Sequence, residues 1–367
     1  MKTQKNNFGY FYRKTFQDIV KNNSILTTLI LSVFLYSFFY PIAYKGQQAT
    51  ALPIIIVDEE QSIASRKIIQ AVTQSPNVEI EAITTNFAEA EALIKAQHAD
   101  GILLLPYNLS NSISRGENGG IGLYLSASNF LKTQKIGLGL ASSLENALAV
   151  QAEKFQHISA YSPALSIHQI PLYNTLSGYG SYVFPAVAPL IVHQTLLLGV
   201  CMLVATYRQK RWQPSGAEFF ALFSAISSIG ILACFYLFGF TYWLNDYPHG
   251  GNFVGMLISV PIYVCCVISI ALFLASFLDI PERAGHVIVF TSIPLFLLSG
   301  TAWAHSAMPT WLQWLGKVLP STQGIQTFIQ LNQMGVATNL VIPKLIYLLC
   351  CASIFLILSI YRLKVKL

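Results

Sequence analysis

The sequence predicts a polytopic α-helical membrane protein with six transmembrane helices and an inserted extracytoplasmic α/β domain. Of its 367 residues, 54% are hydrophobic and only 10% are charged, and the mean hydropathy is +0.53. Soluble domains carry about 25% charged residues, because water must solvate their surface. Low charge with high hydrophobicity also excludes a disordered chain. The sequence also contains long uncharged stretches. One segment, 45–177, interrupts them and has strand and helix patterns of its own.

Six uncharged, apolar stretches are long enough to cross the hydrocarbon core, which takes about 20 residues of helix. They lie near residues 24–44, 182–206, 219–243, 254–278, 286–304 and 343–361. The first is longer than the apolar core of a secretory signal, and no clean cleavage site follows it at once, so we expect an uncleaved anchor. Another uncharged stretch, between Lys317 and Lys344, is too rich in amides to face lipid. We expect it to form a loop or an interfacial helix.

The distribution of Lys and Arg in the short connecting segments predicts the orientation. One set of segments holds twelve basic residues: Lys2, Lys5, Arg13, Lys14, Lys21, Arg208, Lys210, Arg211, Arg283, Arg362, Lys364 and Lys366. The other set holds only Lys317 and Lys344. Since basic loops stay in the cytoplasm, both termini are predicted to be cytoplasmic and the segment 45–177 to be exported.

Residues 1–23 are predicted to form a cytoplasmic amphipathic helix at the membrane interface. Its apolar stripe is Phe8, Phe11, Tyr12, Phe16, Ile19 and Val20, and its polar residues are Lys5, Arg13, Lys14, Asp18 and Lys21. A basic amphipathic helix lies in the interface plane, where it can transmit movement to the first span. Phe11 and Arg13 are therefore candidates for coupling to a partner. The alternative is a plain positive anchor with no mechanical role.

The exported segment 45–177 alternates strands with helices. Buried or alternating strands are expected at 51–58, 78–84, 99–106 and 121–126, and helices at 62–74, 87–97 and about 130–157. This order is typical of a small α/β domain with a mixed sheet. All six cysteines lie in predicted spans, so this domain must be stable without disulfides.

The chain has no recognised enzyme chemistry. It contains no phosphate-binding G-x-x-x-x-G-K-[ST] loop, so ATP hydrolysis would require a separate subunit. The Ser, His and carboxylate residues lack nucleophile-elbow or paired-carboxylate spacing. The histidines lack metal-ligand spacing, and we expect no metal and no cofactor in this chain. Nothing predicts a nucleic-acid partner.

His193 and Gln194 are the polar residues inside the second predicted span. Polar groups in a span mark a functional site by default, so both are candidates for lining a substrate path at a dimer interface. The alternative is an interhelical hydrogen bond.

Several segments resemble the ABC-2-type permease family, the membrane subunits of bacterial ATP-driven exporters. IIIVDEEQSIASRKIIQAVTQSPNVEI (54–80) resembles the family's opening strand, acidic turn, Ser-Arg helix and SP turn, and ADGILLLPYNLS (99–110) its second strand. LLSGTAWAHSAMPTWLQWLGKVLP (297–320) resembles its signature between the last two spans. That signature is carried here by Ser299, Gly300, Met308, Pro309, Trp311, Leu312 and Pro320. With Pro294 nearby, the fifth span is open to breaking and returning as an outer re-entrant hairpin.

The resemblance implies a bacterial inner-membrane permease that works with an ABC ATPase subunit, which binds the ATP and Mg. It implies a second permease copy, or a paralogous one, and in Gram-negative cells a periplasmic adaptor and an outer-membrane channel. The family's cytoplasmic loop meets the ATPase. The loop TYRQKRWQPSGAE keeps Arg208, Gly216 and Glu218 of that pattern but lacks its other acidic residues. These three residues are the further ATPase-coupling candidates.

Three functional classes follow. The leading one is an exporter permease for an amphipathic, drug-like or lipid-like substrate. An ATP-independent secondary transporter is the second, although such folds usually have internal repeats and midplane charges. The third is a membrane-anchored ligand-binding or scaffold protein, for which one span would suffice.

Overall fold

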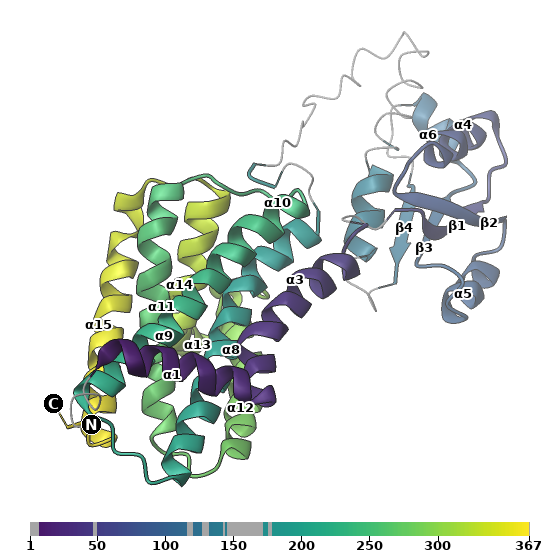
Figure 1. Ribbon diagram of the computed structural model, residues 1–367. Helices are drawn as coiled ribbons and strands as arrows, with labels where there is room; N and C mark the ends of the chain where they lie inside the picture. The colour runs from purple at the N-terminus through teal and green to yellow at the C-terminus, as the bar shows by residue number, and fades with distance from the viewer. Residues whose placement is uncertain are drawn as a thin grey trace. The chain divides into compact units, whose positions relative to one another are not determined.

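The computed structural model describes residues 7–46, 50–115, 120–126, 132–141, 144, 172–174 and 178–366. Contacts divide the chain into two compact units. The helical unit combines Met1–Gln47 with Pro171–Leu367, and the sheet unit is Gln48–Ile170. Each unit is described by itself below, with the elements labelled as in Figure 1.

A mixed four-stranded sheet with the order β2-β1-β3-β4 forms the centre of the sheet unit. The strands are β1 (Leu52–Asp58), β2 (Val78–Thr84), β3 (Gly101–Leu105) and β4 (Gly122–Leu125). β1 pairs in parallel with β2 and β3, and β4 pairs antiparallel with β3. The predicted strands and mixed sheet are therefore present.

Helices cover both faces of this sheet, which explains why β1 is apolar at nearly every position. Ile54 and Ile56 pack with α4 (Ile63–Thr73) and with a helix over residues 132–141. Ile55 and Val57 pack on the other face with α5 (Phe87–Lys95). A strand buried on both faces loses the alternation of a half-exposed one. The helix expected at about 130–157 is described only at 132–141 and 144, and its remainder lies outside the described residues.

The acidic turn after β1 is closed by its own hydrogen bonds. The Ser65 hydroxyl donates to Asp58 Oδ2 at 2.8 Å, and the Ser62 hydroxyl caps α4. Glu60 accepts from the Ser62 hydroxyl and from both the backbone N–H and the hydroxyl of Ser110, in α6 (Leu109–Ser114). These bonds hold the turn between β1 and α4 and connect it to α6.

The helical unit has five helices that are long and apolar enough to cross a membrane, among the described residues. They are Asn23–Ala43, α8 (Gly180–Gln209), Gly216–Leu244, α11 (Phe253–Ala275) and α15 (Thr338–Arg362). The first comprises α2 (Asn23–Leu26), a wider π turn at Thr27–Leu31 and α3 (Ser32–Ala43). The third comprises α9 (Gly216–Phe235), a π turn at Tyr236–Thr241 and α10 (Tyr242–Leu244).

α8 is the central helix of this unit. It contacts α3, α9, α11, α12 and α14, and 83% of its most apolar stretch is buried. Its low amphipathicity follows from this position, because a helix surrounded by others needs apolar residues on every side.

The predicted fifth span, at 286–304, is not confirmed. Its residues form α12 (Ala284–Leu298), which has 15 residues and a length of about 22 Å. The hydrocarbon core is about 30 Å thick, so α12 alone is too short to cross it. The chain turns after Leu298, with Gly300 at a φ of +80° that favours glycine, and returns as α13 (Thr310–Val318) and α14 (Pro320–Phe328).

The amide-rich stretch after α13 packs inside the bundle, against the expectation of a loop or interfacial helix. α14 contacts α8, α11 and α15, and Figure 1 shows α13 and α14 among the long helices. Gln330, in the π turn Ile329–Gln333, accepts a hydrogen bond from the Lys344 ammonium at 2.8 Å, and the Tyr347 hydroxyl donates to the Val318 carbonyl. Since Lys344 and Tyr347 belong to the first half of α15, the α13–α14 turn lies alongside that half.

Amide side chains of this stretch donate to carbonyls at a proline, at a π turn and at a helix end. Pro185 has no N–H to donate back along α8, and the Ser181 carbonyl one turn earlier accepts from Gln333 Nε2 at 3.1 Å. Asn332 Nδ2 donates to the Phe238 carbonyl, in the π turn after α9, also at 3.1 Å. Gln326 donates to the Ser299 carbonyl just past α12. Irregular backbone is tolerated at membrane depth only when protein groups satisfy it in this way.

Candidate functional site

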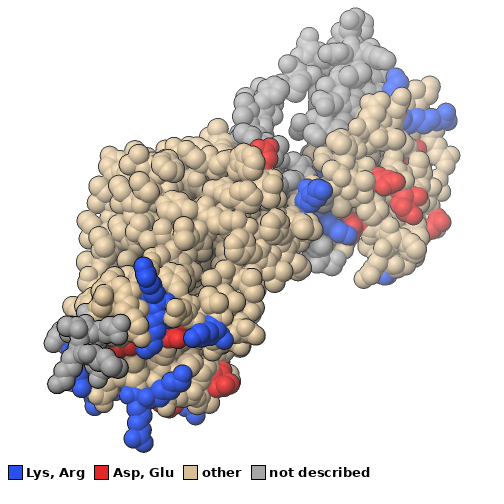
Figure 2. Space-filling model, in the orientation of Figure 1, with Lys and Arg blue, Asp and Glu red and all other residues tan. Residues whose placement is uncertain are grey.

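At one end of the helical unit, α1 and the segment after α15 contact the loop between α8 and α9. α1 (Phe8–Lys21) packs on α9 and is tied to the end of α8, and residue Lys366, just after α15, pairs with the turn before α9. Lys and Arg gather at this end in Figure 2, whereas the visible remainder of the helical unit is almost free of charge. We call this region the basic end; its cations are Arg13, Lys14, Lys21, Arg208, Lys210, Arg211, Arg283, Arg362, Lys364 and Lys366.

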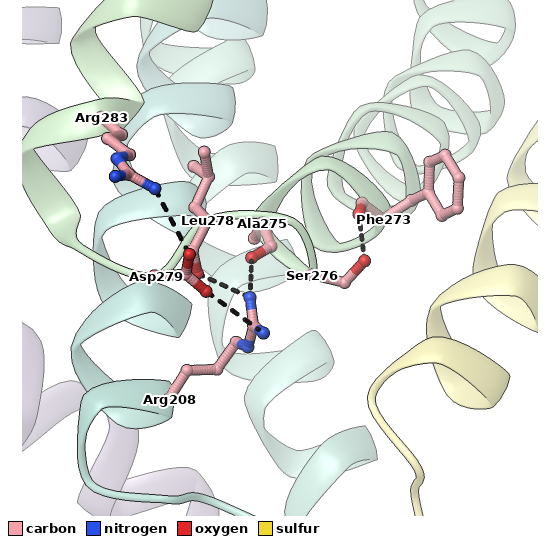
Figure 3. A network of polar contacts seen from close by, with 7 residues as sticks. All are labelled: Arg208, Phe273, Ala275, Ser276, Leu278, Asp279 and Arg283. Atoms are coloured by element: carbon pink, nitrogen blue, oxygen red, sulfur yellow. Dashed lines mark hydrogen bonds and ion pairs between the residues drawn. The ribbon is translucent and has the colours of Figure 1, made fainter.

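Arg208 links the end of α8 to the turn between α11 and α12 (Figure 3). Its Nη1 donates to the Leu278 carbonyl at 2.6 Å and to the Ala275 carbonyl at 3.5 Å. The Ala275 carbonyl belongs to the last residue of α11 and the Leu278 carbonyl follows it, at the end of the helix where the dipole is negative and a cation is stabilised. Arg208 therefore acts as a C-terminal cap supplied by a neighbouring helix.

Asp279 extends this contact to the start of α12. Its carboxylate lies 3.7 Å from Arg208 Nη2 and 3.3 Å from Arg283 Nη1, on opposite sides in Figure 3. Because 68% of the Asp279 side chain is exposed, water screens both ion pairs and each contributes about 1 kcal/mol or less. The carbonyl contacts of Arg208 are therefore the stronger link between α8 and α11.

Tyr207 links α1 to the same end of α8. Its hydroxyl donates to Asp18 Oδ2 at 2.8 Å, and Glu218, in the first turn of α9, is close enough to interact with it electrostatically. Glu218 also follows the Ser215 cap of α9, whose hydroxyl accepts from the Glu218 N–H at 3.3 Å. A carboxylate in the first turn of a helix is stabilised by the helix dipole. Three helices thus meet around one tyrosine.

Gly216 is held by residues that follow the last span. Its N–H donates to the Lys366 carbonyl at 2.8 Å, and the Lys366 N–H donates to the Pro214 carbonyl at 3.0 Å. The two bonds make a parallel bridge between Ser215 and Lys366. Leu363 and Val365 pack against the core on either side of the turn after α15, so the bridge is anchored.

The structure thus places three of the sequence candidates, Arg208, Gly216 and Glu218, at one end of the helical unit. Phe11 is half-buried on the side of α1 that packs on the bundle, whereas Arg13 is exposed on the opposite side. Sequence reasoning missed Asp18, Tyr207, Asp279 and Lys366 as their partners. Of these contacts, the sequence indicates only the one between Asp279 and Arg283, which lie four residues apart, the spacing of an ion pair on a helix.

His193 and Gln194 lie in the middle of α8 but do not converge. Neighbouring residues on a helix point about 100° apart. His193 is buried, and its Nδ1 has no hydrogen-bond partner among the described residues. Gln194 is only partly buried, and its amide oxygen and nitrogen both lack partners there. Among the described residues, no hydrogen bond joins either side chain to another helix.

The signature residues between 297 and 320 build the turns around α13. The Ser299 hydroxyl bonds the Phe296 carbonyl and the Thr301 hydroxyl, and a Cβ on Gly300 would meet the His305 ring at 2.7 Å. His305 Nε2 lies 2.8 Å from the Leu298 carbonyl. Pro309 directly precedes α13, and Pro320 is the first residue of α14.

The other signature residues close or flank the same turns. The Met308 carbonyl accepts from Gln313 Nε2 at 2.9 Å, and Leu312 is half-buried. Trp311 is 67% exposed, as expected of an aromatic residue at a membrane surface. The signature therefore has a structural role in shaping the hairpin.

No group of three or more His, Cys, Asp or Glu side chains that could hold a metal ion occurs among the described residues. All six cysteines are unpaired, and each lies in one of the long helices.

Comparison with known proteins identifies one family. A family model described as ABC-2 family transporter protein matches residues 23–361, which is almost the whole chain. No curated protein matches the sequence.

Proposed function

This chain belongs to the ABC-2 transporter family of membrane permeases, and on that premise we propose that it is the permease subunit of an ATP-driven exporter, coupled at the basic end to a separate ATPase. In this proposal the protein spans the bacterial inner membrane with both termini in the cytoplasm. The sheet unit lies outside, where it meets a periplasmic adaptor and an outer-membrane channel in Gram-negative cells. ATP and Mg bind to the partner ATPase.

The observation that carries this proposal is the set of links around the 207–217 loop. Tyr207 ties the loop to α1, Arg208 ties it to the end of α11, and Gly216 ties it to the segment after α15. A partner that displaces this loop would therefore act on α1, α11 and α15 together. Coupling through a packed, discrete set of contacts is how a local event moves a larger body.

The membrane region supports an amphipathic, drug-like or lipid-like cargo. Within α8 the buried polar atoms without a partner, among the described residues, belong to His193 and Gln194, and those in the neighbouring helices α9, α11 and α14 are serine hydroxyls. A second permease copy, identical or paralogous, is supported by α12, whose outward face carries Val289, Phe290 and Ile293 at 67–78% exposure. The alternatives are an ATP-independent secondary transporter and a membrane-anchored ligand-binding or scaffold protein; neither is favoured by a structural observation.

Co-purification tests the proposal directly. Tagged protein extracted in mild detergent is expected to bring down a subunit with a phosphate-binding loop and to show vanadate-sensitive ATP turnover. The matched control is the same preparation from cells that lack the tagged chain. If neither the subunit nor the turnover is found, the coupling to an ATPase is wrong.

Replacing Glu218 by Ala tests the coupling role of the loop. We expect permease-dependent ATP turnover to fall about tenfold, a loss equivalent to about 1.4 kcal/mol, because the carboxylate interacts electrostatically with Tyr207, at the junction of three helices. The amount of ATPase that co-purifies should change little. Glu282→Ala is the matched control, since Glu282 is an exposed carboxylate in the turn before α12. Unchanged turnover at normal protein levels would remove Glu218 from the coupling role.

A further inference from the structure

The outward side of α1 carries positive charges and no negative charge. Its exposed arc carries Arg13, Lys14 and Lys21 together with Tyr10, Gln17 and Val20. The helix has a single acidic residue, Asp18, and that carboxylate is held against the bundle by the Tyr207 hydroxyl at 2.8 Å. The sequence alone suggests a mixed polar face, because Asp18 is one helical turn from Lys14 and from Lys21. The structure removes the acid from that face and leaves the three cations on it.

These cations have no acidic partner within the described residues. The four ion pairs there join other residues, in the sheet unit and at Asp279. Arg13 and Lys14 also line a hollow of about 430 Å³, with Asn7, Tyr10 and Gln17. The Asn7 side chain accepts from the Gly9 N–H and so closes the first turn of the helix beside this hollow. The surface offers guanidinium, ammonium, hydroxyl and amide donors and no carboxylate.

The position of α1 indicates what meets this surface. Only Asn22 separates it from the first long apolar helix, and the Asn22 side chain caps that helix by accepting from the Ser24 and Ile25 N–H groups. The opposite side of α1 is fixed on α9, where the Tyr12 hydroxyl bonds the Ser228 hydroxyl at 2.9 Å. α1 therefore lies at the point where the chain enters the apolar region of the bundle, and its free side faces away from the protein. Val20, 58% exposed, adds an apolar contact beside the cations.

We propose that the outward side of α1 binds the phosphate headgroups of anionic phospholipids. Arg binds a phosphate through two parallel hydrogen bonds, and Lys binds it as a point charge. Each Lys or Arg near an anionic leaflet contributes about 1 kcal/mol, which is about fivefold in the preference for an anionic over a neutral lipid. Because the far side of α1 carries Asp18 and Tyr207, the lipid contact is directly connected to the end of α8.

The probe is phosphatidylglycerol with a photoactivatable group in its headgroup, compared with the matching phosphatidylcholine. Full-length protein is placed in bilayer discs of equal parts of the two lipids, and cross-links are mapped by mass spectrometry. We expect phosphatidylglycerol to be enriched at residues 7–21. The enrichment should fall about fivefold for each cation removed in Arg13→Gln and Lys14→Gln, and it should weaken with added salt.

Lys317→Gln is the matched control for loss of one positive charge, because Lys317 lies over the Trp314 ring far along the chain from α1; it should leave the enrichment at 7–21 unchanged. Equal cross-linking of the two lipids to α1, or an enrichment that survives the double replacement, would overturn the proposal. If the double variant instead loses a co-purifying ATPase while the wild-type protein shows no lipid preference, the surface serves an acidic protein and the lipid proposal is wrong. The lipid measurement requires no ATPase, so its failure is distinguishable from failure of the proposed function.

Discussion

Replacing Arg208 by Gln is expected to lower permease-dependent ATP turnover tenfold or more while leaving the protein folded. Gln cannot supply the charge-assisted bonds to the Leu278 and Ala275 carbonyls, and such bonds contribute about 1.5–3 kcal/mol each. The end of α11 then loses its cap, and α8 can move without carrying the α11–α12 turn with it. The measurement is vanadate-sensitive turnover of the permease and ATPase complex in bilayer discs.

Two further variants separate charge from geometry at this position. Arg208→Lys keeps the charge but not the planar fork, so it should retain an intermediate activity. Arg211→Gln removes an exposed cation from the same loop and should behave like the wild-type protein. Wild-type turnover in Arg208→Gln, or an equal loss in Arg211→Gln, would show that the contact with α11 has no part in coupling.

Replacing Gly324 by Ala is expected to have the largest effect on stability. A Cβ at this position would lie 2.1 Å from the Tyr263 ring, which is fully buried and whose hydroxyl donates to the Pro189 carbonyl at 2.9 Å. The ring cannot retreat without breaking that bond, and overpacking of a dense core costs about 1–3 kcal/mol or more. Thermal aggregation of the detergent-solubilised protein should therefore begin several degrees lower.

A second replacement makes this result specific to the contact. Tyr263→Leu shortens the facing side chain, so the double variant Gly324→Ala with Tyr263→Leu should be more stable than the sum of the two single changes predicts. Gly285→Ala is the matched control, because nothing lies within 4 Å of its added Cβ in α12. If Gly324→Ala and Gly285→Ala aggregate at the same temperature, α14 does not pack on Tyr263 as described.

The strands and helices were predictable because the apolar residues that each one buries form a pattern within its own short stretch of sequence. β1 is apolar at nearly every position because helices cover both sheet faces, and Ile54 and Ile55 belong to opposite cores. The five long helices were predictable from the absence of charge over the length needed to cross a bilayer. The break after Leu298 was foreseen only as an option, because Pro and Gly permit a break without requiring one.

The rest depended on pairings between distant parts of the chain. The amides of 326–333 predict a stretch outside the membrane interior, because the sequence does not reveal their acceptors at Ser181, Phe238 and Ser299, which come into reach only in the assembled fold. In the same way, the sequence places Asp18 on the polar face of α1. Its contact with Tyr207, which holds the carboxylate against the bundle, is visible only in the structure. Arg208, Gly216 and Glu218 were selected by resemblance, but their partners come from the end of α11, from the segment after α15 and from Tyr207 in α8.

The bridge between Ser215 and Lys366 has a consequence for the order of biosynthesis. Translation makes the 207–217 loop about 150 residues before Lys366, and α11, α12 and α15 must be inserted in between. Until then the Gly216 N–H and the Pro214 carbonyl have no strand to pair with. The loop therefore acquires its final shape only after the last long helix has entered the membrane, so a partner that recognises this shape would bind finished chains and ignore nascent ones.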